Sequence, residues 1–115
     1  MMDGMDVELL VVPDCPNESP TAQLLRTALR DVGLDGVGVT RTVISSQEQA
    51  ESRHFTGSPT ILIDGVDPFP TAGPPSVACR IYLHPDRQSG LPELRALRKA
   101  LKQAAATNIA AAGTP

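Results

Sequence analysis

The order of strand-like and helix-like segments constrains this fold more than any other feature of the sequence. Residues 7–12 read VELLVV, and a nearly continuous apolar run of this length predicts a strand buried on both faces. Residues 19–33 then repeat apolar side chains at helical spacing, with Ser19 placed to cap the helix and Gly33 placed to end it. A strand followed at once by a helix predicts a strand–helix–strand unit with parallel strands.

The same alternation continues along the chain. Further strands are predicted at 37–44, 60–64 and 77–83, and further helices at 45–55 and 91–106. The order β-α-β-α-β-β-α predicts an α/β fold, a three-layer sandwich around a four-stranded mixed sheet. We expect the first three strands to be parallel and the last to be antiparallel to the third, with one helix on one face and two on the other.

Length and charge limit the classes of protein that fit. A chain of 115 residues suits one domain over 1–115, with flexible ends at 1–5 and 107–115. A net charge of −3 argues against a nucleic-acid partner. No apolar run approaches the roughly 20 residues of a membrane span, and the start MMDGMD lacks the features of a signal peptide. We therefore expect a cytoplasmic protein without membrane association.

Cys15 and Cys79 are the only cysteines, so the chain does not read as a secreted disulfide scaffold. Two cysteines and the distant His54 and His84 match no metal-ligand spacing, so we predict neither a metal site nor a cofactor. In a reducing cytoplasm both cysteines are expected to be thiols.

Two short motifs flank the predicted core strands. Cys15-Pro16 directly follows the first strand, and GSPTILIDG at 57–65 places Pro59 directly before the third. With the closing pair of strands and the final amphipathic helix, these motifs resemble the thioredoxin-like superfamily over roughly residues 6–104. The resemblance implies a cis peptide bond at Pro59, with the proline ring against the Cys15 thiol, and it makes these two the catalytic residues.

The resemblance also implies a binding surface around the thiol. Ser58 would offer its backbone groups to an extended peptide or a thiol ligand, with Pro16 and Thr60 as neighbouring binding residues. Phe69 lies in the stiff proline-rich loop 65–76, where it is predicted either to fold over the thiol as a binding residue or to plug the end of the core.

Several residues depart from the pattern of that superfamily. Its redox pair is Cys-x-x-Cys, whereas this chain reads Cys15-Pro16-Asn17-Glu18, which excludes a dithiol shuttle of two adjacent cysteines. Asp14 and Glu18 flank the thiol, and nearby negative charge disfavours a thiolate. Pro20 moves the predicted helix start to Ser19, which leaves Cys15 outside the helix and weakens stabilisation by its dipole.

Three interpretations of Cys15 stay open. It is a monothiol redox residue acting on a protein or low-molecular-weight disulfide, a soft-metal ligand, or an inert remnant in a non-catalytic binding module. Whether the protein is an enzyme stays open with them.

Cys79 has two interpretations of its own. With Ile81 and Leu83 on the same strand face, it is either a small buried hydrophobe or a second thiol for Cys15. A pair of thiols with Asp14 is remotely similar to organomercurial lyases, and thiolates favour soft metals. The predicted hairpin places Cys79 toward the end of the sheet opposite Cys15, which argues against a disulfide between them.

Overall fold

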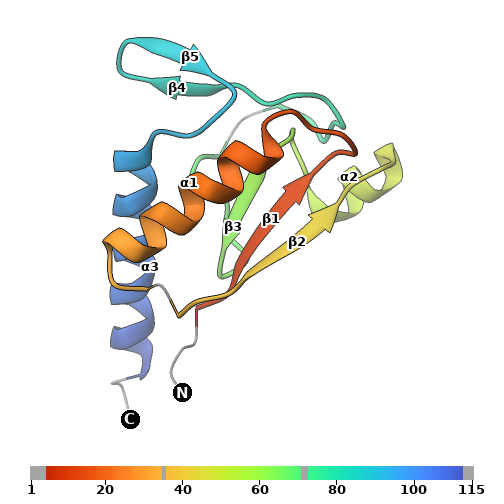
Figure 1. Ribbon diagram of the computed structural model, residues 1–115. Coiled ribbons are helices and arrows are strands. Elements are labelled where there is room, and N and C mark those ends of the chain that lie inside the picture. Colours follow the sequence, from red (N-terminus) through yellow and green to blue (C-terminus); the bar gives the residue numbers. More distant parts are fainter. Residues whose placement is uncertain (1–4, 35, 71–72, 113–115) are drawn as a thin grey trace.

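The structure is a computed structural model that describes residues 5–34, 36–70 and 73–112, with side chains described as far as residue 106. It is an α/β protein with a mixed sheet (Figure 1). The elements in chain order are β1 Val7–Val11, α1 Glu18–Asp31, β2 Val39–Val43, α2 Gln47–Arg53, β3 Thr60–Ile63, β4 Tyr82–His84, β5 Arg87–Ser89 and α3 Leu94–Ala112.

The main sheet has the strand order β2-β1-β3, with β1 in its centre. The strands β1 and β2 are parallel, as predicted, whereas β3 runs antiparallel to β1, so the prediction of three parallel strands was wrong. The reason is the length of α2, because seven helical residues span only about 10 Å. The chain therefore does not return along the sheet, and β3 begins at the edge where β2 ends.

The predicted fourth strand of this sheet is absent from the described residues. The pair Tyr82–His84 and Arg87–Ser89 forms a separate two-stranded sheet instead, closed by the tight turn at Pro85 and Asp86. The part of the chain before it, at 77–80, pairs with the segment before β3 in a parallel bridge between Ser58 and Cys79, and its Arg80 side chain bonds to Thr60 of β3. The four-stranded sheet of the sequence prediction is thus a three-stranded sheet with a detached hairpin.

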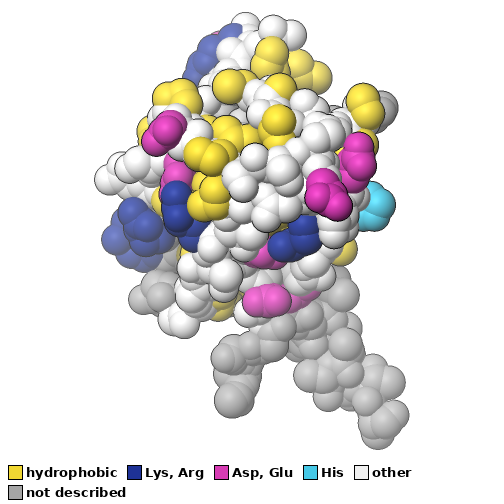
Figure 2. Space-filling model, turned by 90° about the vertical axis from the view of Figure 1, so that its right-hand side faces the viewer, with side chains coloured by type: hydrophobic (Ala, Val, Ile, Leu, Met, Phe, Trp, Pro, Cys, Tyr) yellow, Lys and Arg dark blue, Asp and Glu magenta, His cyan; other side chains and the backbone are white. Residues whose placement is uncertain are grey.

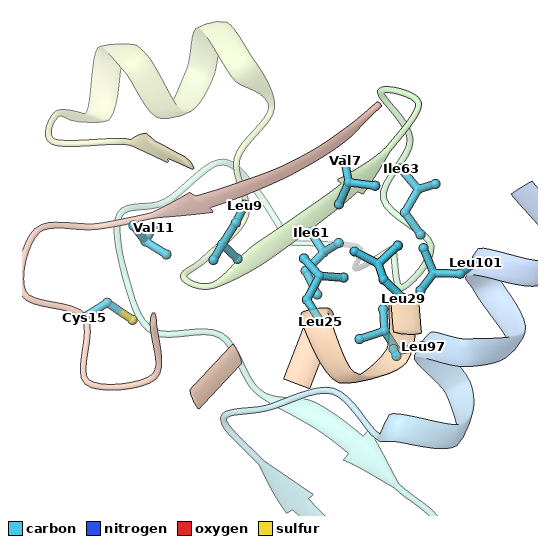
Figure 3. Packing of buried hydrophobic residues seen from close by; sticks show 11 residues of the cluster. Val7, Leu9, Val11, Cys15, Leu25, Leu29, Ile61, Ile63, Leu97 and Leu101 are labelled. Carbon is cyan, nitrogen blue, oxygen red and sulfur yellow. The ribbon is translucent and has the colours of Figure 1, made fainter. Parts of the chain in front are cut away.

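Helices cover both faces of the main sheet. On one face α1 and α3 pack on an aliphatic cluster, shown in Figure 3 and made of Val7, Leu9, Val11, Leu25, Leu29, Ile61, Ile63, Leu97 and Leu101. On the other face the short α2 packs through a smaller cluster of Leu10, Ile44, Ala50 and Phe55. The predicted apolar stripe of α1 is confirmed, since Leu25, Ala28 and Leu29 are all buried.

The end of the chain is more regular than predicted. α3 continues to Ala112, so the helix includes most of the segment 107–115 that we expected to be flexible; residues 113–115 lie outside the described residues. Of the other expected flexible end, 1–5, only Met5 is described. In the described part of the chain no helix is both long and apolar enough to cross a membrane.

Candidate functional site

Cys15 and Pro59 lie at the same edge of the main sheet. Because β1 and β3 are antiparallel, the end of β1 and the beginning of β3 are neighbours, with Leu10 opposite Thr60. One step further along, the Val12 N–H donates a hydrogen bond of 3.0 Å to the hydroxyl oxygen of Ser58. The connection from β1 to α1, which carries Cys15, is thereby tied to the residue that precedes Pro59.

The Cys15 side chain belongs to the edge of the aliphatic cluster and is only 8% exposed. It lies in a turn closed by a hydrogen bond of 3.2 Å from the Glu18 N–H to the Cys15 carbonyl. Helix α1 begins only at Glu18, so the prediction that Cys15 lies outside the helix is confirmed. Pro16 and Asp14 beside it are exposed.

The Ser58–Pro59 peptide bond is cis, as the resemblance implied, and both residues are buried. The backbone groups of Ser58, however, are not available to an incoming chain. Its N–H donates to the Ala78 carbonyl and its carbonyl accepts from the Arg80 N–H, each at 2.9 Å. The expectation that Ser58 offers these groups to a ligand is therefore wrong for this conformation, because residues 78–80 already occupy them.

The proline-rich loop explains this arrangement. It carries the chain back to α2, where the Ser76 N–H donates to the Phe55 carbonyl and the Gln47 side chain donates to the Pro75 carbonyl, each at 2.9 Å. The chain leaves that point in the same direction as β3 and runs parallel to it. A simple hairpin after β3 would have run the other way.

Cys79 is consequently neither buried nor remote from Pro59. It is exposed and bridges Ser58, so the predicted buried position and the predicted opposite end of the sheet are both wrong. The alternation of this segment is inverted, with Arg80 and Tyr82 buried while Ile81 is 60% and Leu83 is 79% exposed.

The contacts of Arg80 account for the reversed burial pattern of this segment. Its buried guanidinium donates to the Thr60 hydroxyl at 3.1 Å and to the Asp67 carboxylate at 2.8 Å, and also to the carbonyl of Phe69. Gly57 makes room for it, since a Cβ at that position would lie 2.8 Å from the Arg80 Cβ. The sequence reasoning missed both Arg80 and Asp67; a lone arginine in the apolar run VACRIYL was the available signal.

Tyr82 is the second buried polar residue of this segment. Its hydroxyl donates to the Pro59 carbonyl at 2.5 Å, and the Arg80 guanidinium carbon lies 4.6 Å from the centre of its ring. Burial raises the pKa of Tyr82, and the neighbouring Asp67 acts in the same direction against the opposing Arg80. Sequence reasoning assigned this tyrosine no role.

The predicted binding residues Thr60 and Phe69 take part in the same contacts. The Thr60 hydroxyl donates to the Gly57 carbonyl at 2.6 Å, in addition to accepting from Arg80. The Phe69 ring packs against the aliphatic cluster and meets the Tyr82 ring edge-on at 5.7 Å between centroids. Both residues thus hold the proline-rich loop and the segment before β4 against β3.

One of the two acidic residues that flank Cys15 is paired with a basic residue. Glu18 forms an ion pair with Arg41 of β2, and this hydrogen bond and charge lower the pKa of Glu18. Arg53 of α2 pairs with Glu8 at 2.7 Å. The basic partner of the acidic flank is therefore Arg41.

The described residues contain no group of three or more His, Cys, Asp and Glu side chains that could hold a metal ion. A hollow of about 560 Å³ lies between the loop after β3 and α3, lined by residues that include Val66, Phe69 and Lys99. Neither cysteine lines it.

Fold and site together define an α/β protein in which a serine precedes a cis-proline, pairs with an exposed cysteine and bonds to the connection that carries a core-packed cysteine. Searches against protein-family models, curated proteins and solved structures found no match.

Proposed function

We propose that the chain is a thioredoxin-like thiol protein that carries out thiol–disulfide exchange at Cys15. The observation that carries this proposal is the hydrogen bond between Val12 and Ser58, which ties the Cys15 connection to the Ser58–Pro59 segment. Once residues 78–80 are displaced, the backbone groups of Ser58 could pair with an extended bound chain.

The exchange needs the Cys15 thiol, a disulfide substrate and a second thiol that releases the product. The Cys15 thiolate attacks one sulfur of a disulfide R–S–S–R′, so that the Cys15–S–S–R bond forms and R′S⁻ leaves and takes up a proton. A second thiolate then attacks the Cys15 sulfur and releases RS⁻. The disulfide is reduced by two electrons, and the attacking thiols are oxidised to a disulfide.

Part of the negative charge beside Cys15 is offset or screened. The Glu18 carboxylate is held by Arg41, which offsets one of the two flanking negative charges. Asp14 is exposed, where water and salt screen its charge.

Access to Cys15 depends on the segment before β4. Residues 78 and 80 hold the backbone groups of Ser58, and an extended substrate that used those groups would have to displace them. Under this proposal the segment 77–80 moves aside when a protein substrate binds.

A non-catalytic binding module is the second candidate, and the exposed apolar side chains favour it. Val77, Ile81 and Leu83 are all exposed on the segment around β4. Figure 2 shows the end of the molecule near α2 and the β1–α1 connection, where hydrophobic side chains gather in the upper half of the face among charged ones. Exposed apolar surface of this kind commonly marks a partner site.

Transfer of a disulfide-bonded group tests the proposal. The Cys79→Ser variant, in which Cys15 is the only thiol, is mixed at neutral pH with a peptide disulfide-linked to glutathione, and adducts are identified by intact mass. We expect a mixed disulfide on Cys15 and its release by added glutathione, and no adduct on the Cys15→Ser/Cys79→Ser protein.

Each competing class predicts another result. A binding module retains a thioether version of the peptide equally with or without Cys15, and forms no mixed disulfide. A mercury-handling protein binds one mercuric ion tightly only when both cysteines are present. The exchange proposal is abandoned if Cys15 forms the adduct in urea but not in the folded protein.

A further inference from the structure

We infer that Cys79 is the second thiol of the site and closes an intramolecular disulfide with Cys15. This inference rests on the proposed exchange at Cys15 and replaces the external thiol of its second step. It assigns the missing partner of the monothiol to a residue 64 positions further along the chain.

Ser58 connects the two cysteines in space. It pairs with Cys79 in a parallel bridge, and paired residues of neighbouring strands direct their side chains to the same side. The Ser58 side chain reaches the Val12 N–H, in the connection that leads to Cys15. The Cys79 side chain therefore leaves its strand on the side where that connection lies.

A second contact involves the connection from β1 to α1 just after Cys15. Gly90, just after β5, lies so close to Asn17 that a Cβ at Gly90 would be 2.3 Å from the Asn17 side-chain nitrogen. The chain from 79 to 90 thus contacts Ser58 at its beginning and Asn17, two residues after Cys15, at its end. Figures 1 and 3 agree, since the segment leading into β4 passes the β1–α1 connection and the Cys15 sulfur points toward it.

The two thiols differ in a way that suits two successive steps. Cys15 is held in the packed edge of the core, whereas Cys79 is exposed and lies between the two residues whose backbone groups bond to Ser58. A disulfide requires Cα atoms within about 7 Å. Under this inference the segment that carries Cys79 makes that approach while Cys15 stays in place.

The chemistry balances without an external oxidant. Cys15 first forms the mixed disulfide with R and releases R′SH, as above. The Cys79 thiolate then attacks the Cys15 sulfur, the bond to R breaks, and RS⁻ leaves and takes up a proton. The substrate disulfide becomes two thiols, and the two protein thiols become the Cys15–Cys79 disulfide.

Reaction with an aromatic disulfide that releases a coloured thiol tests this assignment. The reduced wild-type protein and the Cys15→Ser and Cys79→Ser variants are each mixed with the reagent in excess, and the intact mass is measured after the colour stops rising. Cys15→Ala serves as a second variant, because removal of a core-packed side chain can impair folding.

We expect two coloured thiols per wild-type chain and a monomer two hydrogens lighter than the reduced protein, without label. Each single-cysteine variant should release one coloured thiol and keep one label. The release of the second thiol from the wild type should not depend on protein concentration.

The inference is overturned if the wild type keeps two labels or forms a disulfide-linked dimer. If the wild type keeps both labels and Cys79→Ser is labelled at Cys15, exchange at Cys15 survives and only the role of Cys79 fails. If folded Cys79→Ser is not labelled at all, the proposed function itself has failed.

Discussion

Arg80 is the residue on which the position of the proline-rich loop depends. Its buried guanidinium is paired with Asp67, and its Nε has no hydrogen-bond partner among the described residues. Replacing Asp67 by alanine would leave a buried cation without its counter-charge, which typically costs 3–5 kcal/mol. Because the Asp67 side chain is partly exposed, we expect Asp67→Ala to lower the free energy of unfolding by about 3 kcal/mol.

Urea denaturation followed by circular dichroism measures this loss. Asp86→Ala is the matched control, because the Asp86 side chain is exposed and its ion pair with Arg87, at 3.8 Å, is exposed too. Its free energy of unfolding should stay within about 0.5 kcal/mol of the wild type. Equal effects of the two substitutions would show that the buried ion pair does not hold the loop.

Alkaline titration followed by tyrosinate absorbance reports on Tyr82 alone, because it is the only tyrosine and the chain has no tryptophan. Its raised pKa means that the fold favours the neutral phenol. The stability that this group contributes is complete below its unfolded-state pKa of about 10 and is lost as pH rises toward the higher folded-state pKa. We expect tyrosinate absorbance to appear only together with loss of helical circular dichroism.

The Tyr82→Phe variant is the control for the titration. It should show no tyrosinate absorbance and should lose about 1 kcal/mol of stability, because the hydrogen bond to the Pro59 carbonyl is removed. Ionisation of Tyr82 near its ordinary pKa in a protein with intact circular dichroism would contradict the buried hydrogen bond.

At the scale of elements, the approach of the segment before β4 to β3 depends on Gly57. This glycine has a φ of 137°, and Arg80 lies where a side chain would begin. Gly65, in the turn after β3, also has a positive φ, of 80°, but nothing lies within 4 Å of its missing Cβ. The two glycines therefore share a positive φ but differ in whether another residue lies against the missing Cβ.

We expect Gly65→Ala to cost about 1 kcal/mol, from backbone strain alone. Gly57→Ala should cost at least about 2 kcal/mol more, because the segment carrying Arg80 must also move away from β3. Thermal and urea unfolding measure both values. Similar losses for the two variants would mean that the segment does not pack closely on Gly57.

The elements with strong local signals were predictable from the sequence. The apolar run at β1, the leucine stripe of α1 and the short apolar β3 all lie close to their predicted ranges. The direction of β3 was not predictable, because local pattern fixes the faces of a strand but not its neighbours. The alternation at 77–83 also failed, since it cannot tell which face is buried when Arg80 has a distant partner in Asp67.

At the scale of the whole molecule, the sequence predicted the part of the candidate site around Cys15 and Pro59 but not the position of Cys79. Cys15 and the cis Pro59 were found from their motifs, and the structure places them at one edge of the main sheet. The position of Cys79 was predicted incorrectly, because it depends on where the proline-rich loop releases the chain. That point is set by long-range contacts of Ser76 with Phe55 and of Pro75 with Gln47, which leave no local signal in the sequence.

The central claim of this account is that the Cys15 connection and the Cys79 segment meet at Ser58. A short bifunctional thiol reagent that fluoresces only when two neighbouring thiols close it, dibromobimane, tests that meeting without any redox step. The account predicts a fluorescent, singly cross-linked monomer from the folded wild type, at a rate independent of protein concentration, and none from Cys15→Ser or Cys79→Ser. Separate alkylation of both cysteines in the folded wild type, without fluorescence, would contradict it.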